Sequence, residues 1–435
     1  MHKTIFIPIE IRSRDYFPRL LIAQFFASKG FVVFFGRKRE IELLTKFFTN
    51  CFYLGLQTSK TYLPFYQKLK NKNFQIFVYD EEGLVTLNDE IYLSTRVSNE
   101  IINTVDHFIC WGKKQFNLIN NSISNINKKK ILNFGNPRID ILKKKYRSLF
   151  FNEIKKIEFK NYILINMGFG HANHFLGKKA LNKKIKNNNF LTTKRDREIY
   201  NKFRKYRKDR FVLFKKTIIK LIKLNPNQMF VIRPHPSENE KEYIHLKKHT
   251  NVIVTKEYNV IPWILKSKIV LSDYCSTAIE AKILGVPAIS YKIPKNISFL
   301  DKSFYNTSIK ASSFFKLNQI IKKKKLVKKG SILKLKERLV NIGDNFFSSK
   351  KIFNYITRNY CLDKHNNKIN KINYFLGKLV ISIYLLIFKH SYTEEKCKDI
   401  SNIYLNKDLN NLSKIEKKKG LNIKKVCQSV FEIKQ

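Results

Sequence analysis

The sequence predicts an α/β fold of two Rossmann-like domains whose parallel sheets face a cleft, followed by a basic helical C-terminal tail. Short runs rich in Ile, Val and Phe alternate with stretches of helical periodicity, which is typical of parallel βαβ units. The alternation occurs twice, on either side of a Lys-rich stretch at residues 140–160. We therefore expect an N-terminal domain over residues 1–150, a second domain over 151–320 and the tail over 321–435.

The individual elements follow from these patterns in chain order. In the first half, short apolar runs predict strands at 3–9, 31–35, 50–54, 75–78, 107–111 and 131–134. In the second half they predict strands at 162–167, 228–232, 252–254, 269–272 and 288–291. Residues 179–207 are very basic and predict a solvated insertion or a long exposed helix. Further helices are expected at 276–284, where Gly285 ends the helix, and at 332–347 and 353–360.

The charge balance of the chain is strongly basic. Its 435 residues include 85 Lys and Arg against 33 Asp and Glu, a formal net charge of +52. Such an excess attracts polyanions and anionic membrane surfaces. The abundance of Lys, Asn and Ile has a second explanation, the codon usage of an AT-biased genome. At 43% hydrophobic residues the chain can bury a core and is not globally disordered.

The spacing of the cysteines and the hydropathy of the chain indicate which cofactors and which cellular location to expect. The six cysteines are far apart and form no C-x-x-C pair, which argues against a zinc site and fits a reducing cytoplasm. The apolar run at the N-terminus is too short for a signal peptide. No stretch reaches the roughly 18–20 apolar residues of a membrane span. The nearest, Phe375–Phe388, predicts either an interfacial helix on the anionic inner face of the cytoplasmic membrane or a helix packed on the protein itself.

A histidine between two prolines follows one strand of the second half. Arg233, Pro234, His235 and Pro236 stand where an α/β sheet presents ligand-facing side chains. The prolines restrict the backbone on both sides of His235. His235 can then hold or protonate a phosphate oxygen and Arg233 can pair with phosphate. A surface turn with an incidental histidine is the alternative.

A Ser/Thr pair follows a second strand of the same half. Ser276 and Thr277 stand at the expected helix start, so their hydroxyls and the N–H groups of the first turn predict an anion site. Glu280, one turn further, either binds ribose hydroxyls or completes a capping box with Ser276 or Thr277. Helix capping without any bound anion would also explain why Ser276 and Thr277 stand at a helix start.

Three further groups complete the candidate site. One strand of the first half ends in three acids and a glycine: Asp80, Glu81, Glu82 and Gly83. Mutual repulsion and burial would raise the pKa of one of these carboxylates toward that of a general base. A solvated turn is the alternative. Gly168 and Gly170 follow a strand and would let the backbone approach a phosphate or sugar. Arg12 and Arg14 follow the first strand and would pair with an acceptor carboxylate, or are ordinary surface charge.

These motifs together resemble a known enzyme class. The acid-acid-Gly, His-Pro and Ser/Thr motifs resemble those of bacterial sialyltransferases and Kdo transferases of the GT-B glycosyltransferase fold. The runs IFIPIEIRSRDY, FGNPRIDIL, IRPHPSE and LSDYCSTAIEAKILGVPAISY resemble surface carbohydrate biosynthesis proteins of bacterial polysaccharide clusters, over about residues 3–300.

The resemblance implies roles for particular residues. Glu81 or Glu82, with Glu81 favoured, would deprotonate the acceptor. His235 would contact the donor phosphate and help the nucleotide leave, and Ser276 with Thr277 would bind that phosphate. This chain has Cys-Ser-Thr where some relatives have paired serines, which leaves open which hydroxyl makes the contact. Such enzymes use a CMP-activated acidic sugar without a metal, and the chain has no Asp-x-Asp motif.

The expected function is therefore an inverting glycosyltransferase of capsule or lipopolysaccharide biosynthesis. It would transfer from a CMP-sugar to a glycan or lipid-linked glycan, with no cofactor. One rival is a CDP-polyol transferase of teichoic-acid type, which needs a first-half histidine as base; apart from His2, only His107 is available. The other is a basic nucleic-acid-binding protein, but the recognition motifs of that class are missing, so no nucleic acid partner is expected.

Overall fold

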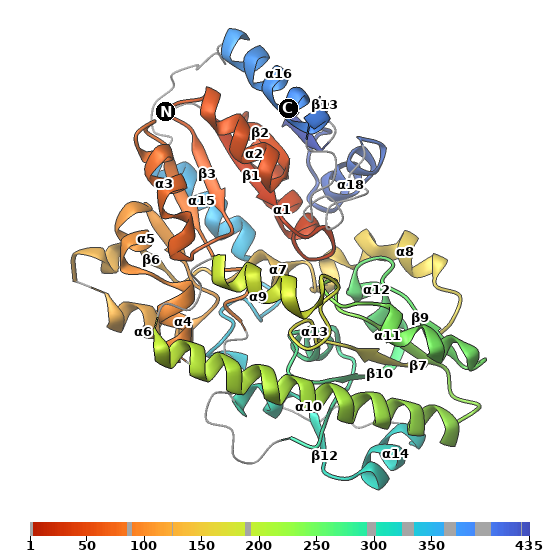
Figure 1. Cartoon of the computed structure of the whole chain (residues 1–435). Helices are drawn as coiled ribbons and strands as arrows, with labels where there is room; N and C mark the ends of the chain where they lie inside the picture. Colours follow the sequence, from red (N-terminus) through yellow and green to blue (C-terminus); the bar gives the residue numbers. More distant parts are fainter. Residues whose placement is uncertain are drawn as a thin grey trace. The chain divides into compact units, whose positions relative to one another are not determined.

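The computed structural model divides the chain into two compact units, each with its own sheet (Figure 1). Unit 1 comprises residues 1–83, 96–149 and 336–435, and unit 2 comprises residues 84–95 and 150–335. The structure describes residues 3–84, 89–123, 125–187, 193–293, 302–323, 335–360, 371–387, 402–427 and 429–435. The expected α/β class with two parallel-sheet domains is confirmed.

Unit 1 contains an eight-stranded sheet in the order β13-β14-β2-β1-β3-β4-β5-β6. Six of its strands are parallel: β1 (Thr4–Ile9), β2 (Val32–Arg37), β3 (Phe52–Gly55), β4 (Gln75–Val78), β5 (His107–Ile109) and β6 (Ile131–Leu132). All six residues of β1 are buried, as expected for a central parallel strand covered on both faces. The carboxyl ends of these strands meet at one edge of the sheet.

Helices connect and cover these strands. Those of unit 1 are α1 (Arg12–Ala27), α2 (Lys38–Leu44), α3 (Leu63–Lys70), α5 (Asn99–Thr104), α6 (Lys113–Ser122), α7 (Pro137–Asp140), α15 (Ser348–Tyr360), α16 (Lys371–Ile387) and α18 (Asn402–Ile415). A short 3₁₀ turn, η1 (Thr45–Phe47), follows α2. Helix α1 is buried along nearly its whole length because α7, α15 and α18 pack on it as well as the sheet.

The last hundred residues are part of unit 1. Strands β13 (Asn422–Cys427) and β14 (Val430–Lys434) form a hairpin, and β14 pairs antiparallel with β2. The Asp140 carboxylate accepts hydrogen bonds from Asn341 and from the backbone N–H groups of Ser348 and Ser349. The hairpin is an addition to the helical tail that the sequence predicts, and residues 335–347 form turns rather than the expected helix.

Unit 2 contains a six-stranded parallel sheet in the order β12-β11-β10-β7-β8-β9. Its strands are β7 (Tyr162–Asn166), β8 (Phe230–Arg233), β9 (Val252–Val254), β10 (Ser267–Ser272), β11 (Ala288–Tyr291) and β12 (Ile309–Ala311). Its helices are α4 (Asp89–Arg96, whose last residue is assigned to unit 1), α8 (Phe151–Lys156), α9 (Gly177–Asn187), α10 (Lys194–Leu224), α11 (Lys241–Ile244), α12 (Val260–Lys266), α13 (Thr277–Leu284) and α14 (Phe314–Lys322).

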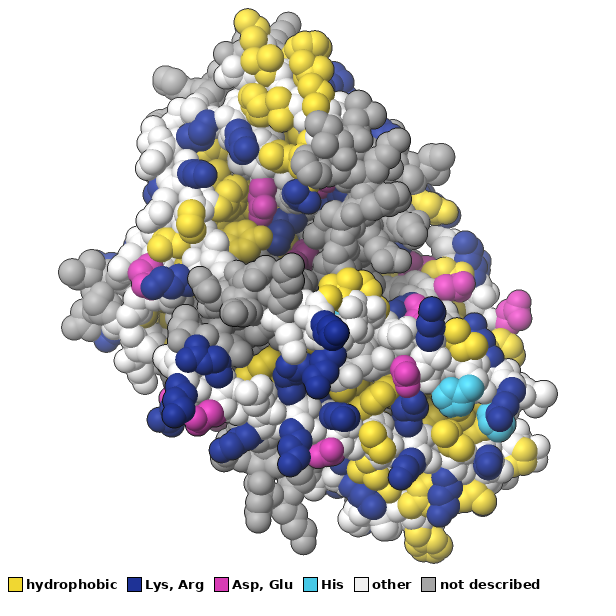
Figure 2. Space-filling view, viewed as in Figure 1, with side chains coloured by type: hydrophobic (Ala, Val, Ile, Leu, Met, Phe, Trp, Pro, Cys, Tyr) yellow, Lys and Arg dark blue, Asp and Glu magenta, His cyan; other side chains and the backbone are white. Residues whose placement is uncertain are grey.

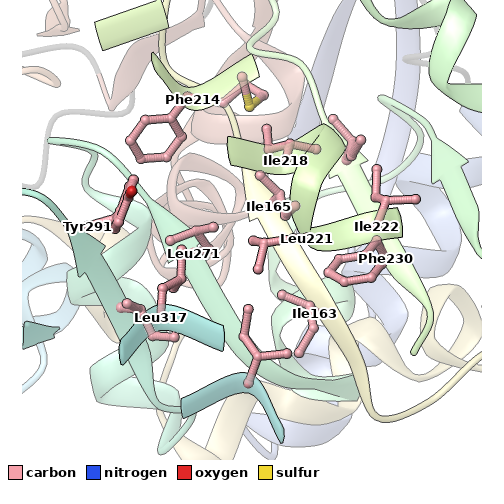
Figure 3. Close-up of a cluster of buried hydrophobic side chains, with 14 of the residues drawn as sticks. Ile163, Ile165, Phe214, Ile218, Leu221, Ile222, Phe230, Leu271, Tyr291 and Leu317 are labelled. Carbon is pink, nitrogen blue, oxygen red and sulfur yellow. The ribbon is translucent and has the colours of Figure 1, made fainter. Parts of the chain in front are cut away.

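Helix α10 is 31 residues long, and its second half packs on the sheet of unit 2. A capping box of Thr193 and Asp196 begins it. Its second half supplies Phe214, Ile218 and Leu221 to a buried cluster with strand residues such as Ile165 and Leu271 (Figure 3). The basic stretch expected at 179–207 therefore contains most of α9 and the first part of α10, with residues 188–192 outside the described residues. The buried part of α10 follows this stretch. Gly285, at φ 83°, ends α13 in the left-handed conformation, as expected.

Candidate functional site

Three strand ends of unit 2 converge at the carboxyl edge of its sheet. Strands β10, β7 and β8 are adjacent and parallel, so the loops that follow them meet. The Asn166 side chain, at the end of β7, donates a hydrogen bond to the Thr277 hydroxyl at the start of α13. A Cβ added to Gly170 would lie 2.1 Å from the Ser237 Oγ in the loop after β8. A side chain at position 170 would therefore displace the Ser237 hydroxyl from its place beside His235.

His235 lies exposed in the loop after β8, between buried Pro234 and exposed Pro236. Its Nδ1 lies 2.8 Å from the Ser237 Oγ and accepts a hydrogen bond of 3.2 Å from the Ser237 backbone N–H. Because a backbone N–H only donates, Nδ1 acts as acceptor and the proton of the neutral ring is on Nε2. Nε2–H is the group that can donate to a phosphate oxygen.

Arg233, at the end of β8, is buried and faces backbone carbonyls. Its guanidinium donates to the carbonyls of Lys256, Glu257 and Tyr258, at 2.6 Å for Glu257, and lies over the Trp263 ring. Burial lowers the pKa of Arg233 to about 10. In this structure Arg233 positions the loop after β9, and its use as a phosphate ligand would require it to leave those carbonyls.

Ser276 and Thr277 stand at the start of α13, where the sequence predicts an anion site. Ser276 is the N-cap residue, and its side chain makes no capping hydrogen bond to the helix. Thr277 is buried and its hydroxyl accepts from Asn166, with the Cys275 sulfur 3.2 Å away. Ser276 and Glu280 are partly exposed. Ser276 is thus the better placed of the two hydroxyls to contact a ligand.

A buried charge cluster shapes the turn between β10 and α13. Asp273 forms ion pairs with Arg207 and Arg210 of α10, at 3.0 and 2.8 Å. Arg207 also donates to the Gly168 carbonyl at 2.6 Å, which connects this turn to the loop after β7. Next in the chain, Tyr274 has φ 47°, a left-handed conformation that costs free energy in a non-glycine residue. The two arginines therefore hold both loops in place.

Glu238 is a buried residue that stabilises the loop after β7. Its carboxylate accepts hydrogen bonds from the Phe169 backbone N–H and from the Tyr243 hydroxyl. Burial raises the pKa of Glu238 to about 7. Phe169 lies between Gly168 and Gly170, so Glu238 fixes the glycine loop next to His235.

Glu81 of unit 1 is buried beneath the carboxyl end of β4. Its Oε1 lies 3.3 Å from Nε of Arg19 in α1, and its other oxygen lies 3.4 Å from the Asn136 amide nitrogen. Arg138 donates to the Glu81 backbone carbonyl at 3.0 Å. Burial, and next the nearby Asp15 carboxylate, raise the pKa of Glu81 above its ordinary value. A raised pKa suits a general base near neutral pH.

Glu82, the next residue, is exposed where Glu81 is buried. It forms ion pairs with Arg96 and, at 3.4 Å, with Arg14. Arg96 also lies 3.7 Å from Asp80. The two glutamates of the motif thus have different surroundings, one desolvated and one at the surface between two arginines.

Arg12 and Arg14 both lie in the first turn of α1. Arg14 forms ion pairs with Asp15 and Glu82. Burial lowers the pKa of Arg14, but the carboxylates around it, Asp15 first, raise the pKa above its ordinary value. Arg12 is half-buried with its guanidinium 5.7 Å from the Tyr16 ring centroid. Arg14 is therefore the one of the pair that lies beside the acidic motif.

Sequence reasoning missed several residues that build these sites. In unit 2 they are Asn166, Arg207, Arg210, Ser237, Glu238 and Asp273. In unit 1 they are Asp15, Arg19, Asn136 and Arg138. For Asn136 and Arg138 a signal existed in FGNPRIDIL, whose Gly-Asn-Pro turn follows a strand. Arg207 and Arg210 lie on α10, far from any motif, so nothing in the local sequence distinguishes them from the other basic residues there.

His107 is the one histidine among the described residues of unit 1. It lies at the amino end of β5, the opposite edge of the sheet from Glu81, and stacks on Phe77. Its Nε2 bonds the Tyr360 hydroxyl at 2.7 Å, and burial lowers its pKa. Within the described parts of the chain, no cluster of three or more His, Cys, Asp or Glu side chains could hold a metal ion.

No family model and no curated protein matches the chain, whereas solved structures share its fold. UDP-GlcNAc 2-epimerase from Methanocaldococcus jannaschii, solved with UDP-GlcNAc and UDP, matches at 12% identity and a TM-score of 0.51, over 82% of this chain and 99% of that one. MnaA from S. aureus, solved with UDP, matches at 12% identity and 0.50, over 85% and 99%. These likenesses show a GT-B-like fold.

Proposed function

We propose that the protein is an inverting, metal-independent glycosyltransferase of surface polysaccharide biosynthesis that takes its sugar from a CMP-activated acidic donor. The observation that carries this proposal is the convergence of the loops after β7, β8 and β10, which brings His235, Ser276 and a close-packed glycine loop to one edge of the unit 2 sheet. Ligands of open α/β sheets bind at this edge.

Unit 2 binds the donor phosphate in this proposal. The Nε2–H of His235 and the Ser276 hydroxyl donate to phosphate oxygens, and the eight-residue helix α13 presents its N-terminus to the same negative charge. As the bond from the sugar to the phosphate breaks, its electron pair goes to the phosphate oxygen. Donors already in place stabilise that charge, which is commonly the largest catalytic contribution.

Unit 1 supplies the base. The Glu81 carboxylate takes the proton of the acceptor hydroxyl while the hydroxyl oxygen attacks the anomeric carbon, so a single displacement inverts the configuration. Burial raises the pKa of Glu81, which favours proton transfer. Glu82 is the alternative base, and Arg14 or Arg12 would pair with an acceptor carboxylate.

The CDP-polyol rival would have to use His2, which lies outside the described residues, because of where His107 lies. A CDP-polyol transferase needs a histidine base in the first half of the chain, but His107 lies at the amino end of β5 and its ring is held by Tyr360 and Phe77. A residue in that place does not reach the edge of the sheet where ligands bind.

The deciding experiment is calorimetric titration of the full chain with CMP, CDP and UDP, followed by transfer assays with CMP-sialic acid and CMP-Kdo. We expect CMP to bind most tightly, and His235→Ala to weaken binding while His245→Ala, an exposed histidine of the same unit, does not. Preferential UDP binding with 2-epimerisation of UDP-GlcNAc would instead indicate an epimerase. Transfer from CDP-glycerol would indicate the polyol transferase, and failure of all three nucleotides to bind would overturn the proposal.

A further inference from the structure

Helix α16 (Lys371–Ile387) has two different faces. Its inner face packs on α2, η1 and β13 of the same unit. Gly377 lies so close to η1 and α2 that an added Cβ would be 2.7 Å from Leu44 and 3.2 Å from Phe47. The Tyr374 hydroxyl donates to Glu432 at 2.7 Å, and Ile381 is fully buried. The helix is therefore a fixed part of unit 1.

The outer face of α16 is apolar and exposed. Phe375 is 65% exposed and Ile372 71%. Four more large apolar side chains extend the stripe at helical spacing, each between about a third and a half exposed: Leu376, Leu379, Val380 and Ile383. Figure 2 shows this group of hydrophobic side chains over α16, at the top of the view. Soluble surfaces rarely leave such a continuous patch unless it binds something.

Among the described residues, the exposed charges on the elements that pack against α16 are all basic. They are Arg39 of α2, Lys46 of η1, and Lys424 and Lys425 of β13. Lys378, on α16 itself, lies over the Tyr374 ring. The acids of α2 do not offset them, because Glu40 is buried in an ion pair with Arg37 and burial raises the pKa of Glu42 to about 7.

We propose that the outer face of α16 docks on the surface of an anionic lipid bilayer, with the apolar stripe in the headgroup boundary and the surrounding cations on lipid phosphates. An apolar stripe bordered by Lys and Arg is the composition of interfacial helices. At 17 residues α16 is about 26 Å long and lies parallel to the bilayer. No helix among the described residues is long and apolar enough to cross a membrane.

The positive charge around the outer face of α16 favours a lipid surface as its partner over a second copy of the chain. In a symmetric dimer formed through this face, the same cations would approach their own counterparts, and like charges across an interface oppose association. Anionic headgroups neutralise those cations instead. The proposal is independent of the proposed enzymatic function.

Vesicle flotation of the full chain tests this docking face. We expect binding to phosphatidylcholine vesicles that contain phosphatidylglycerol, and much less to phosphatidylcholine alone. The double variant Phe375→Ser with Leu379→Ser should lower the partition coefficient by about tenfold or more, since two apolar side chains lose their lipid contact. Phe315→Ser is the matched control, because Phe315 is 71% exposed on α14 in unit 2.

The basic charge of the whole chain requires a second readout. At about 0.5 M salt, where Coulomb attraction is screened within a few ångströms, the difference between wild type and the double variant should persist. A Phe375→Trp variant should shift its emission to the blue when vesicles are added, while native Trp111 and Trp263 are buried and should not respond. Equal binding of wild type and double variant would overturn the proposal, as would self-association through this face without vesicle binding.

Discussion

Arg19 and Glu81 form a buried ion pair, 3.3 Å between Nε and Oε1, that connects α1 to the carboxyl end of β4 in unit 1. Neither side chain is more than 2% exposed. Arg19 also donates to the Leu54 and Gly55 carbonyls at the end of β3 and lies over the Tyr79 ring. One arginine thus sets the position of the carboxylate to which we assign acceptor deprotonation.

Replacing Glu81 separates its proposed chemistry from its structural role. Glu81→Gln keeps the size and one hydrogen-bond acceptor but removes the base, so we expect turnover to fall by roughly two to four decades. Melting temperature should also fall, because Arg19 is left as a buried charge without its partner. Glu82→Gln is the matched control, and transfer assays with thermal melts distinguish the two. A larger activity loss in Glu82→Gln would assign the base to Glu82.

His235 and its neighbour Ser237 should differ in the size of their effect. His235→Ala removes the proposed phosphate donor and should lower turnover by roughly two to four decades with little change in melting temperature, because the ring is exposed. Ser237→Ala removes only a hydrogen bond to Nδ1, so a loss of about five- to tenfold is expected. Steady-state kinetics of both variants would measure this order. Activity near wild type in His235→Ala would contradict its role.

Glu238 should make the stability of unit 2 depend on pH. Its pKa is about 7 in the folded chain against an ordinary 4.5, so between these values the folded state binds more protons than the unfolded state. Stability then decreases as pH rises from about 4.5 to 7, by up to about 3 kcal/mol. Glu238→Gln should flatten this dependence relative to wild type, as measured by chemical denaturation at several pH values.

Asp140 should be required for the C-terminal segment to stay folded on unit 1. Its carboxylate accepts from Asn341, from the Ser348 and Ser349 backbone N–H groups, and from the Ser349 hydroxyl at 2.7 Å. Asp140→Ala leaves these buried donors without an acceptor and should cost about 3 kcal/mol or more. Denaturant unfolding measures the loss. The exposed Asp344→Ala, in the same segment, should change stability by less than about 0.5 kcal/mol.

Strand positions could be predicted from sequence because a buried parallel strand needs a continuous apolar run. The strands expected at 3–9, 75–78 and 288–291 are examples, because the structure has them at 4–9, 75–78 and 288–291. The prediction of a helix at 332–347 was wrong for residues 335–347, because the backbone there bonds to a distant segment of the chain. There the Val340 N–H donates to the Trp111 carbonyl and the Glu337 carbonyl accepts from Lys114, so backbone groups pair with another segment instead of within a helix.

The amino-acid sequence alone determined the α/β class, the two βαβ series, and the presence of His-Pro, Ser/Thr and acidic motifs at strand ends, since each depends on residues adjacent in the chain. Only the tertiary structure decided what those motifs touch: that Arg233 faces carbonyls, that Arg207 and Arg210 hold Asp273, that Glu81 is buried against Arg19, and that α16 keeps an exposed apolar face. Such partners lie tens to hundreds of residues apart, and their pairing follows from packing and burial that no local pattern encodes.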